Sequence, residues 1–310
     1  MEVDETMNSK HLIKLKNTIV AIHGERGDFW WRTLPKLLND LALSHGLTLQ
    51  APFEELTFNY VLPVLGPNRE AWVLKLGVPH YEFTREIHSL EHYNGEGCIR
   101  LIDANSIDGW IIMERCIPGA RLVDINDKKQ TIPIAVSVMQ RLWRPIKNTE
   151  YFTPLAQWLE SLEQLNSKEL LQHLVRKSLR DFIFSRSQEL LSSQGEQVLL
   201  HGDLHHYNIL QHQSEWLAID PKGIIGEREF EIGACLRNPL RVVEDPQKTK
   251  EIADNLALII ELTGFDRQRV LSWCIIQAVL CVCWYCEDKM LEKAHQLTAF
   301  AERLYSFLLI

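Results

Sequence analysis

The feature that most constrains this chain is a polar loop, HGDLHHYNIL, between two short apolar runs, QVLL and WLAID. Runs of this length and composition predict strands, so the loop is expected to connect two of them. Four residues separate Asp203 from Asn208, and Asp220 follows twelve residues later at the end of the second run. We expect the loop to present Asp203 and Asn208 to one phosphate, and the strand end to place the Asp220 carboxylate where it can bind a metal ion.

The chemistry of the three residues is that of phosphoryl transfer. The Asp-x-x-x-x-Asn spacing is that of the kinase catalytic loop H-R-D-x-x-x-x-N. In that arrangement Asp203 accepts the proton of an attacking hydroxyl, while oxygens of Asn208 and Asp220 bind Mg²⁺. The usual Asp-Phe-Gly is replaced here by Asp220-Pro221-Lys222-Gly223, and a lysine beside a metal-binding carboxylate is unexpected.

A second candidate is Lys75, which lies inside the apolar run AWVLKL. A lysine within an apolar strand is costly unless it is paired, although an isolated one can extend its amine to water. We expect Glu86 in the following helix to be its partner, with Glu82 one turn earlier as the alternative. This pair would hold the α- and β-phosphates of a nucleotide.

The order of elements predicts an α+β fold with a small antiparallel-sheet N-lobe and a larger helical C-lobe. A helix over TLPKLLNDLALSHG ends at Gly46, the runs LTFNYVLPVL and EAWVLKLGV predict strands, and a helix over YEFTREIHSLEHY closes at Gly95. Strands over CIRLIDA and GWIIMER follow, then helices including LAQWLESLEQL, ELLQHLVRKSLRDFIF and one capped by Asp266. We divide the chain into an N-lobe (1–113), a hinge (114–119) and a C-lobe (120–310) that carries the catalytic loop.

Composition excludes several classes of protein. A net charge of −8 argues against a nucleic-acid binder. The N-terminus lacks a signal-peptide pattern, and the apolar run 270–286 is short for a membrane span and contains Ser272 and Gln277, so we expect a cytoplasmic protein with no membrane contact. The seven cysteines have no framework spacing, and Cys281, Cys283 and Cys286 favour buried thiols over a metal site.

The motif HGDLHHYNIL followed by IDPKG, with VLKLGVP upstream, resembles the aminoglycoside phosphotransferases. The chain is most similar to their branch of streptomycin 6-kinases and aminoglycoside/hydroxyurea resistance kinases, and segments such as MERCIPGARL and FEIGACLRNP extend the likeness along most of it. The resemblance implies a protein-kinase-like bilobal fold, ATP or GTP, Mg²⁺, and phosphorylation of an antibiotic hydroxyl, with antibiotic resistance as the role. It also implies the roles of Asp203, Asn208, Asp220, Lys75 and Glu86 given above, and an adenine-binding hinge at Glu114, Arg115 and Cys116.

The chain departs from the kinase pattern in its phosphate loop. No glycine-rich loop is present, and Thr57-Phe58-Asn59-Tyr60 stands in its place, so Asn59 is a candidate to cover the phosphates. No G-x-x-x-x-G-K-[ST] occurs. For a cationic acceptor the candidate contacts are Glu227 and Glu229, and His205 could also face the substrate.

Other interpretations stay open. His-x-Asp-x-His at 201–205 could begin a binuclear phosphoesterase site, but no Gly-Asn-His segment follows it. The acceptor could be a sugar, a choline-like compound or an amino alcohol, and a nucleotide-binding pseudokinase is the alternative from another class. A protein kinase is disfavoured because no A-P-E segment follows Asp220. We expect a monomer or weak dimer that binds a nucleotide and a small-molecule acceptor. His201 and Glu231 are interpreted as structural, bracing the loop.

Overall fold

The computed structural model describes residues 9–125, 128–146, 148–239 and 241–308. Contacts divide the chain into two units, one formed by the residues up to Gly95 with Ile99–Ile117, the other by Glu96–Cys98 with Pro118–Ile310. The boundary between Ile117 and Pro118 lies inside the segment 114–119, which was predicted to be a hinge.

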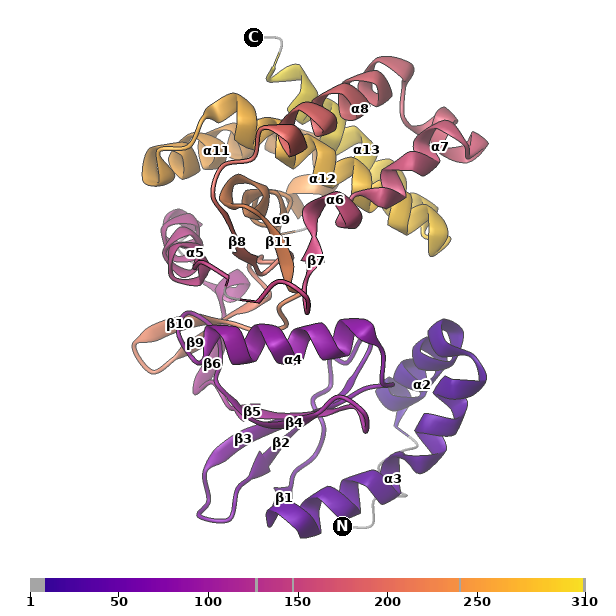
Figure 1. Ribbon diagram of the computed structural model, residues 1–310, viewed down its shortest axis with the longest axis vertical. Helices are drawn as coiled ribbons and strands as arrows, with labels where there is room; N and C mark the ends of the chain where they lie inside the picture. The colour runs from indigo at the N-terminus through magenta and orange to yellow at the C-terminus, as the bar shows by residue number, and fades with distance from the viewer. Residues whose placement is uncertain (1–8, 126–127, 147, 240, 309–310) are drawn as a thin grey trace. The chain divides into compact units, whose positions relative to one another are not determined.

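The first unit is built on a five-stranded antiparallel sheet with the order β1-β2-β3-β5-β4. Its strands are β1 (Thr48–Leu49), β2 (Tyr60–Leu65), β3 (Ala71–Leu76), β4 (Leu101–Asn105) and β5 (Trp110–Glu114). Helix α4 (Tyr81–Tyr93) runs along the sheet, and α2 (Lys10–His23) and α3 (Glu25–His45) pack against each other beside it (Figure 1). Fully buried leucines of α2 and α3 share one core with β2 and β3. The predicted N-lobe elements are therefore present.

Two helices in this unit end at a residue in the left-handed conformation. Helix α3 ends as expected at Gly46, which is left-handed with φ of 63°. Helix α4 ends one residue earlier than predicted, at Asn94, which is left-handed with φ of 46° and donates its N–H to the Leu90 carbonyl at 2.9 Å. Asparagine tolerates the left-handed region better than most residues, so it can end a helix as glycine does.

The second unit contains two three-stranded sheets. One has the order β10-β9-β6, from β6 (Pro118–Arg121), β9 (Ile209–His212) and β10 (Glu215–Ala218). The other has the order β7-β11-β8, from β7 (Thr153–Pro154), β8 (Gln197–Leu200) and β11 (Ile224–Glu227). The predicted strands QVLL and WLAID therefore lie in different sheets, and β9 and β11 were missed. Strand β9 is short and half-buried along most of its length, so it lacks a clear apolar alternation.

The helices of this unit are α5 (Lys128–Leu142), α6 (Leu155–Trp158), α7 (Glu169–Leu174), α8 (Lys177–Ser192), α9 (Ile232–Leu236), α10 (Arg241–Glu244), α11 (Thr249–Thr263), α12 (Arg267–Glu287) and α13 (Leu291–Ser306). Short 3₁₀ turns lie at Leu122–Asp124, Glu160–Asn166, Arg228–Glu231 and Pro246–Lys248. Two predicted helices are broken: LAQWLESLEQL is α6 followed by a 3₁₀ turn, and ELLQHLVRKSLRDFIF divides where Val175 and Arg176 are extended. At this interruption the Val175 carbonyl accepts a hydrogen bond from the Arg180 side chain at 2.6 Å. The carbonyl therefore has a partner although the helix does not continue.

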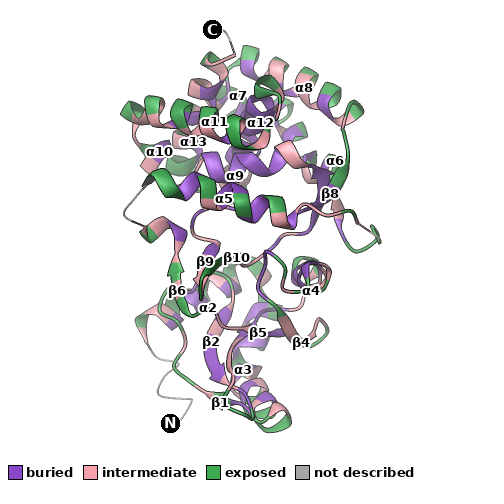
Figure 2. Cartoon of the chain, turned by 90° about the vertical axis from the view of Figure 1, so that its left-hand side faces the viewer, coloured by how far each residue is buried: buried purple, intermediate pink, exposed green. Residues whose placement is uncertain are grey.

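Helix α12 forms the core of the second unit. Every residue from Val270 to Cys283 is buried (Figure 2). Its N-cap is Asp266, as predicted, whose carboxylate accepts from the Arg269 N–H at 2.7 Å. By length and composition alone α12 could cross a membrane, but 78% of its apolar window is buried inside the protein. It is the buried helix that the sequence analysis expected, and the cysteines on it are free thiols.

Candidate active site

The polar loop begins where β8 ends, and its first turn depends on a glycine. Gly202 has φ of 83°, and a Cβ at this position would run into the Ile224 side chain of β11. Both the backbone conformation and the close approach of β11 therefore require glycine here. The turn directs the chain from the buried end of β8 to Asp203.

Two buried residues, His201 and Glu231, hold this turn in place. The Glu231 carboxylate accepts the N–H groups of His201 at 2.7 Å and Gly202 at 3.0 Å. The His201 ring accepts the Asp203 N–H on Nδ1 at 3.2 Å, and its Nε2 donates to the Ile219 carbonyl at 2.7 Å. Burial lowers the pKa of His201 to about 4 and raises the pKa of Glu231 to about 7. Both residues brace the loop, as the sequence analysis expected.

The Asp203 carboxylate lies between two nitrogen-bearing side chains. Arg237 Nη2 donates to one oxygen at 2.9 Å, and His205 Nε2 lies 3.5 Å from the other. Burial alone would raise the pKa of Asp203, but the hydrogen bond from His205 and the charges of Arg237 and Lys222 hold it well below its usual range. Asp203 is therefore ionised at neutral pH and can accept a proton. His205, a candidate for substrate contact, instead lies beside this carboxylate.

Arg237 was missed by the sequence analysis. Its guanidinium also donates to Gln277 Oε1 on α12. A Cβ at Gly233 on α9 would collide with Gln277 Oε1, so glycine there makes room for this contact. Two signals could have found the pair: Arg237 follows the apolar run IGACL, and Gln277 is polar within the apolar α12. Buried polar groups of this kind need partners.

Asn208 directly precedes β9, and Asp220 lies just after the end of β10. The Asn208 amide nitrogen donates to the Asp203 carbonyl at 3.1 Å, and the Asn208 carbonyl accepts the Ile219 N–H at 3.0 Å, which places Asp220 next along the chain. The amide oxygen of Asn208 is thereby left to act as a ligand. Asp220 is left-handed with φ of 61°, an uncommon conformation that clusters at functional sites. One carboxylate and one amide oxygen fit Mg²⁺, which keeps further positions for water and phosphate.

The structure also locates Lys222. Its N–H donates to the His201 carbonyl at 2.7 Å, and its positive charge contributes to the low pKa of Asp203. The residue therefore belongs to the electrostatic surroundings of the loop. Among the described residues no three His, Cys, Asp or Glu side chains are grouped to hold a metal, so the His-x-Asp-x-His phosphoesterase interpretation has no geometric support.

In the first unit, Lys75 and Glu86 form the expected ion pair. Lys75 Nζ lies 2.6 and 2.8 Å from the two Glu86 oxygens, and both residues are buried. The alternative partner, Glu82, lies nearer the surface beside Arg85 and His80. Asn59 packs against Gly77 so closely that a Cβ there would collide with its Oδ1.

Two of the three predicted hinge residues already use their backbone N–H groups in hydrogen bonds within the protein. The N–H groups of Glu114 and Arg115 donate to the carbonyls of Arg100 at 3.0 Å and Ala71 at 3.1 Å. Cys116 is buried, and burial together with the charge of Glu114 raises its pKa to about 12. A base edge at this segment would therefore use the Cys116 N–H or the carbonyl groups.

The acidic residues predicted to contact an acceptor lie elsewhere. Glu227 is 1% exposed, and its oxygens accept from Arg269 at 2.7 and 2.8 Å and from the Trp273 indole. Glu229 belongs to the same charge cluster, where burial and Glu227 raise its pKa. The proposed substrate role of Glu227 is therefore wrong, because this carboxylate is buried and already neutralised by structural partners.

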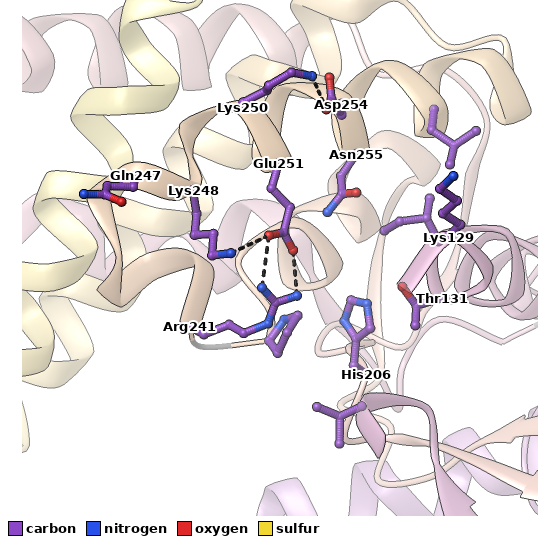
Figure 3. A pocket seen from close by; sticks show the side chains of 14 residues that line it. Lys129, Thr131, His206, Arg241, Gln247, Lys248, Lys250, Glu251, Asp254 and Asn255 are labelled. Carbon is purple, nitrogen blue, oxygen red and sulfur yellow. Dashed lines mark hydrogen bonds and ion pairs between the residues drawn. The ribbon is translucent and has the colours of Figure 1, made fainter. Parts of the chain in front are cut away.

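A cavity of about 850 Å³ opens beside the polar loop (Figure 3). His206, three residues after Asp203, forms part of its wall, together with Pro239 and Arg241 shortly after Arg237. The remaining wall comes from α5 and α11 and the turns that precede them. This cavity could not be predicted from the sequence, because its lining residues come from separated segments.

Comparisons with known proteins agree with this geometry. A family described as aminoglycoside/hydroxyurea antibiotic resistance kinase matches residues 54–289. The chain is 26% identical to streptomycin 6-kinase of Streptomyces glaucescens over 91% of this chain and 94% of the relative. It is 28% identical to hydroxyurea phosphotransferase of Kitasatospora aureofaciens, over 91% and 82% respectively.

Solved structures show the fold. Choline kinase LicA from Streptococcus pneumoniae superposes with a TM-score of 0.61 at 14% identity, covering 88% of this chain and 99% of that one. A thermostable mutant of aminoglycoside phosphotransferase APH(4)-Ia, in a ternary complex with ADP and hygromycin B, has a TM-score of 0.58 at 11% identity, covering 86% and 96%. The predicted protein-kinase-like fold is confirmed.

Proposed function

Because the chain belongs to the aminoglycoside/hydroxyurea antibiotic resistance kinases and is a small-molecule kinase, we propose that Asp203 is the base that activates an acceptor hydroxyl for phosphoryl transfer. The observation that carries the proposal is the setting of Asp203. Its carboxylate is kept ionised by Arg237 and His205, and its backbone is fixed by His201. Ionisation at the operating pH and a fixed position are two of the properties that a general base needs.

The reaction balances as follows. The acceptor oxygen forms a bond to the γ-phosphorus of a nucleoside triphosphate, while the bond from that phosphorus to the β,γ-bridging oxygen breaks. The hydroxyl proton passes to a carboxylate oxygen of Asp203 and then to solvent. The products are the phosphate monoester and the nucleoside diphosphate.

The nucleotide and metal are assigned to residues that fit them. Asn208 and Asp220 would hold Mg²⁺, which supplies charge neutralisation at the phosphates when bound. Lys75, oriented by Glu86, would contact phosphate, and the segment Glu114–Cys116 would contact the base. ATP and GTP are both compatible with this assignment. The homologous APH(4)-Ia and amicoumacin kinase structures are bound to ADP and AMP-PNP, which supports a nucleotide co-substrate here.

An aminoglycoside such as streptomycin is the acceptor suggested by relatives named streptomycin 6-kinase. Glu227, one of the two carboxylates expected to receive its cationic groups, does not serve that purpose because it is buried against Arg269. The proposal therefore extends to a hydroxyl of another small molecule, such as a sugar, a choline-like compound or an amino alcohol.

The test is a nucleotide-consumption screen with Mg²⁺ over aminoglycosides, sugars, sugar acids and amino alcohols. Phosphorus NMR of the product distinguishes a new phosphate monoester from hydrolysis to inorganic phosphate. We expect a monoester with at least one acceptor, formed ~10²–10⁴ times more slowly by the Asp203→Asn variant. Nucleotide binding without any monoester across the panel would favour the pseudokinase alternative instead.

A further inference from the structure

Lys222 is a half-buried lysine close to the catalytic loop whose charge is not neutralised by a protein carboxylate. It lies two residues after Asp220, within the segment that replaces the usual Asp-Phe-Gly. Among the described residues, its ammonium forms no ion pair and donates no hydrogen bond. Burial removes water from a charged group, so a partly buried ammonium without a partner favours the binding of an anion.

The backbone of Lys222 is fixed against the turn that carries Asp203. Its N–H donates to the His201 carbonyl at 2.7 Å, and a Cβ at Gly202 would lie 3.2 Å from the Lys222 Cβ. The Lys222 side chain therefore leaves the backbone beside Gly202, the residue before Asp203. Burial raises the pKa of Asp203, and Lys222 is one of the charges, after those of His205 and Arg237, that lower it. The ammonium is thus within electrostatic reach of the base.

Lys222 is near Asp203 without being its partner. The Asp203 oxygens are contacted by Arg237 at 2.9 Å and by His205 at 3.5 Å. Arg237 is itself enclosed, since its guanidinium also donates to Gln277 and its side chain is 13% exposed. An ammonium has three N–H donors, and in the part of the chain that the structure describes Lys222 uses none of them on a protein group. Of these three side chains, Lys222 is the one whose donors remain available to a ligand.

The proposed reaction needs such a cation. The Asp203 carboxylate and the γ-phosphate are both anionic, so they repel each other when the acceptor hydroxyl lies between them. In the transition state, charge is also spread over the three equatorial oxygens of the phosphoryl group. In protein kinases a glycine-rich loop covers the phosphates, and this chain lacks that loop. A cation beside Asp203 would offset the repulsion and stabilise the charge.

The position of Lys222 favours the phosphate over the acceptor as its partner. Asp220, two residues earlier, is assigned to Mg²⁺ at the phosphates, and Pro221 restricts the backbone between them. One short, stiff segment would therefore bring a metal ligand and an ammonium to the same phosphate chain. The aminoglycoside proposed as acceptor carries ammonium or guanidinium groups, which a lysine repels.

We propose that Lys222 is a further catalytic residue, whose ammonium contacts the γ-phosphate of the nucleotide and neutralises charge on the phosphoryl group during transfer. This inference rests on the proposed function of Asp203 and adds a residue to the same site. The acceptor oxygen bonds to the γ-phosphorus, the bond to the bridging oxygen breaks, and the hydroxyl proton passes to Asp203. Lys222 keeps its own proton throughout.

The first measurement is nucleotide binding, which needs no acceptor. AMP-PNP and ADP, each with Mg²⁺, are titrated calorimetrically onto the wild type and Lys222→Met, because only AMP-PNP has a γ-phosphoryl group. The guanine analogues replace them if they bind more tightly. We expect Lys222→Met to weaken AMP-PNP binding about tenfold, the worth of one charge-assisted hydrogen bond, and ADP binding by less than about twofold. Retained ADP binding also shows that the variant is folded. Lys222→Arg keeps a cation and should restore most of the AMP-PNP affinity.

The second measurement is turnover with the best acceptor of the screen. Lys222→Met should lower kcat by ~10²–10³, the usual effect of removing one group that stabilises transition-state charge, and should leave the acceptor KM within about twofold. The matched control is Lys16→Met, because Lys16 on α2 is also half-buried and forms no ion pair among the described residues. This control should leave the binding of both nucleotides and the turnover unchanged.

Three results would overturn the inference. Equal losses for AMP-PNP and ADP would place Lys222 at the α- and β-phosphates or in the fold. Lower turnover with unchanged binding of both nucleotides would make it a positioning residue for Asp203. Unchanged binding and turnover would place its side chain outside the site. Asp203→Asn separates this inference from the proposed function: a near-normal rate in that variant refutes the base, whereas the loss of AMP-PNP affinity in Lys222→Met depends only on the phosphate contact.

Discussion

At the residue scale, Asp203 has its properties because its neighbours oppose its burial. Desolvation would raise the pKa of this carboxyl, whereas the contacts with His205 and Arg237 lower it. Arg237 is in turn held by Gln277, a polar side chain on the buried helix α12. We regard Arg237 as a positioning residue, because it acts on the reaction only through Asp203.

Removing Arg237 should therefore change the pH profile. In Arg237→Gln, one of the charges that counteract the effect of burial on Asp203 is removed, so the pKa of Asp203 rises. As pH falls, the Asp203 carboxylate is then protonated, and lost as a base, at a higher pH than in the wild type. We expect an acid limb in kcat/KM between about pH 4 and 6 in the variant, and none in that range from this group in the wild type. Arg176→Gln, which removes the surface pair with Glu302, is the control. Identical acid limbs in the three proteins would show that Arg237 does not tune Asp203.

His201 and Glu231 predict opposite pH dependences of stability. Glu231 keeps its proton in the folded state up to about pH 7, above its unfolded value of 4.5, so its contribution is present below pH 4.5 and is lost as pH rises through 7. His201 stays neutral down to about pH 4, below its unfolded value of 6.5, so its contribution is present above pH 6.5 and is lost as pH falls through 4. Between pH 4.5 and 6.5 the two residues therefore change the unfolding free energy with pH in opposite directions, and these changes largely cancel in the wild type.

Single variants should expose these slopes. Between pH 4.5 and 6.5, the unfolding free energy of Glu231→Gln should rise with pH relative to wild type, and that of His201→Gln should fall, each by on the order of 2–3 kcal/mol. Urea denaturation at the two pH values measures both. Parallel pH profiles in all three proteins would contradict the assigned protonation states.

At the scale of elements, the site depends on how closely α9, α12 and β11 approach the loop. Gly202 admits the Ile224 side chain of β11, and Gly233 admits Gln277 of α12. Each glycine therefore marks a contact between two elements, and the loop geometry follows from both contacts. These approaches could not be read from the sequence, since they join segments 22 to 44 residues apart.

The approach at Gly233 can be tested by a double-mutant cycle. Gly233→Ala should cost about 1–3 kcal/mol of unfolding free energy, because the added methyl collides with Gln277. The same change should cost little in a Gln277→Ala background, so the two effects should be strongly non-additive. Gly195→Ala, where the added methyl meets open space, is the control. Additive effects would show that the collision is relieved in another way.

The sequence predicted the residues of the motif better than the elements that hold them. The spacing of Asp203, Asn208 and Asp220 reflects a local loop, and the Lys75–Glu86 pair follows from the cost of burying a lone charge. Arg237, Gln277 and the cavity beside the loop were missed because each depends on tertiary contacts between distant segments. The substrate role given to Glu227 was wrong for the same reason, since its partners Arg269 and Trp273 lie on a helix about forty residues away.

At the scale of the whole molecule, the proposed functional residues are divided between the two units. The first unit contributes the buried pair Lys75–Glu86, and the second contributes Asp203, Asn208, Asp220 and Lys222. A buried ion pair adds little net stability compared with apolar residues of similar size. Its presence in the first unit is therefore better explained by a function than by stability.

This explanation predicts a separation of stability from activity. Glu86→Gln leaves the Lys75 charge buried without its carboxylate partner and should destabilise the protein by about 3–5 kcal/mol. The double variant Lys75→Met with Glu86→Leu should recover most of that stability, yet lose nucleotide affinity and turnover. Thermal unfolding and nucleotide titration together provide the readout. A double variant that is both stable and fully active would make the pair purely structural.

In the proposed reaction, Asp203 accepts the proton of the acceptor hydroxyl. The most direct measurement is single-turnover phosphoryl transfer in Asp203→Asn, with nucleotide affinity measured in parallel. We predict an unchanged fold, nucleotide affinity close to that of the wild type, and a transfer rate lower by ~10²–10⁴, the usual contribution of a positioned base. A variant that transfers phosphate at a near-normal rate would contradict the assignment of Asp203.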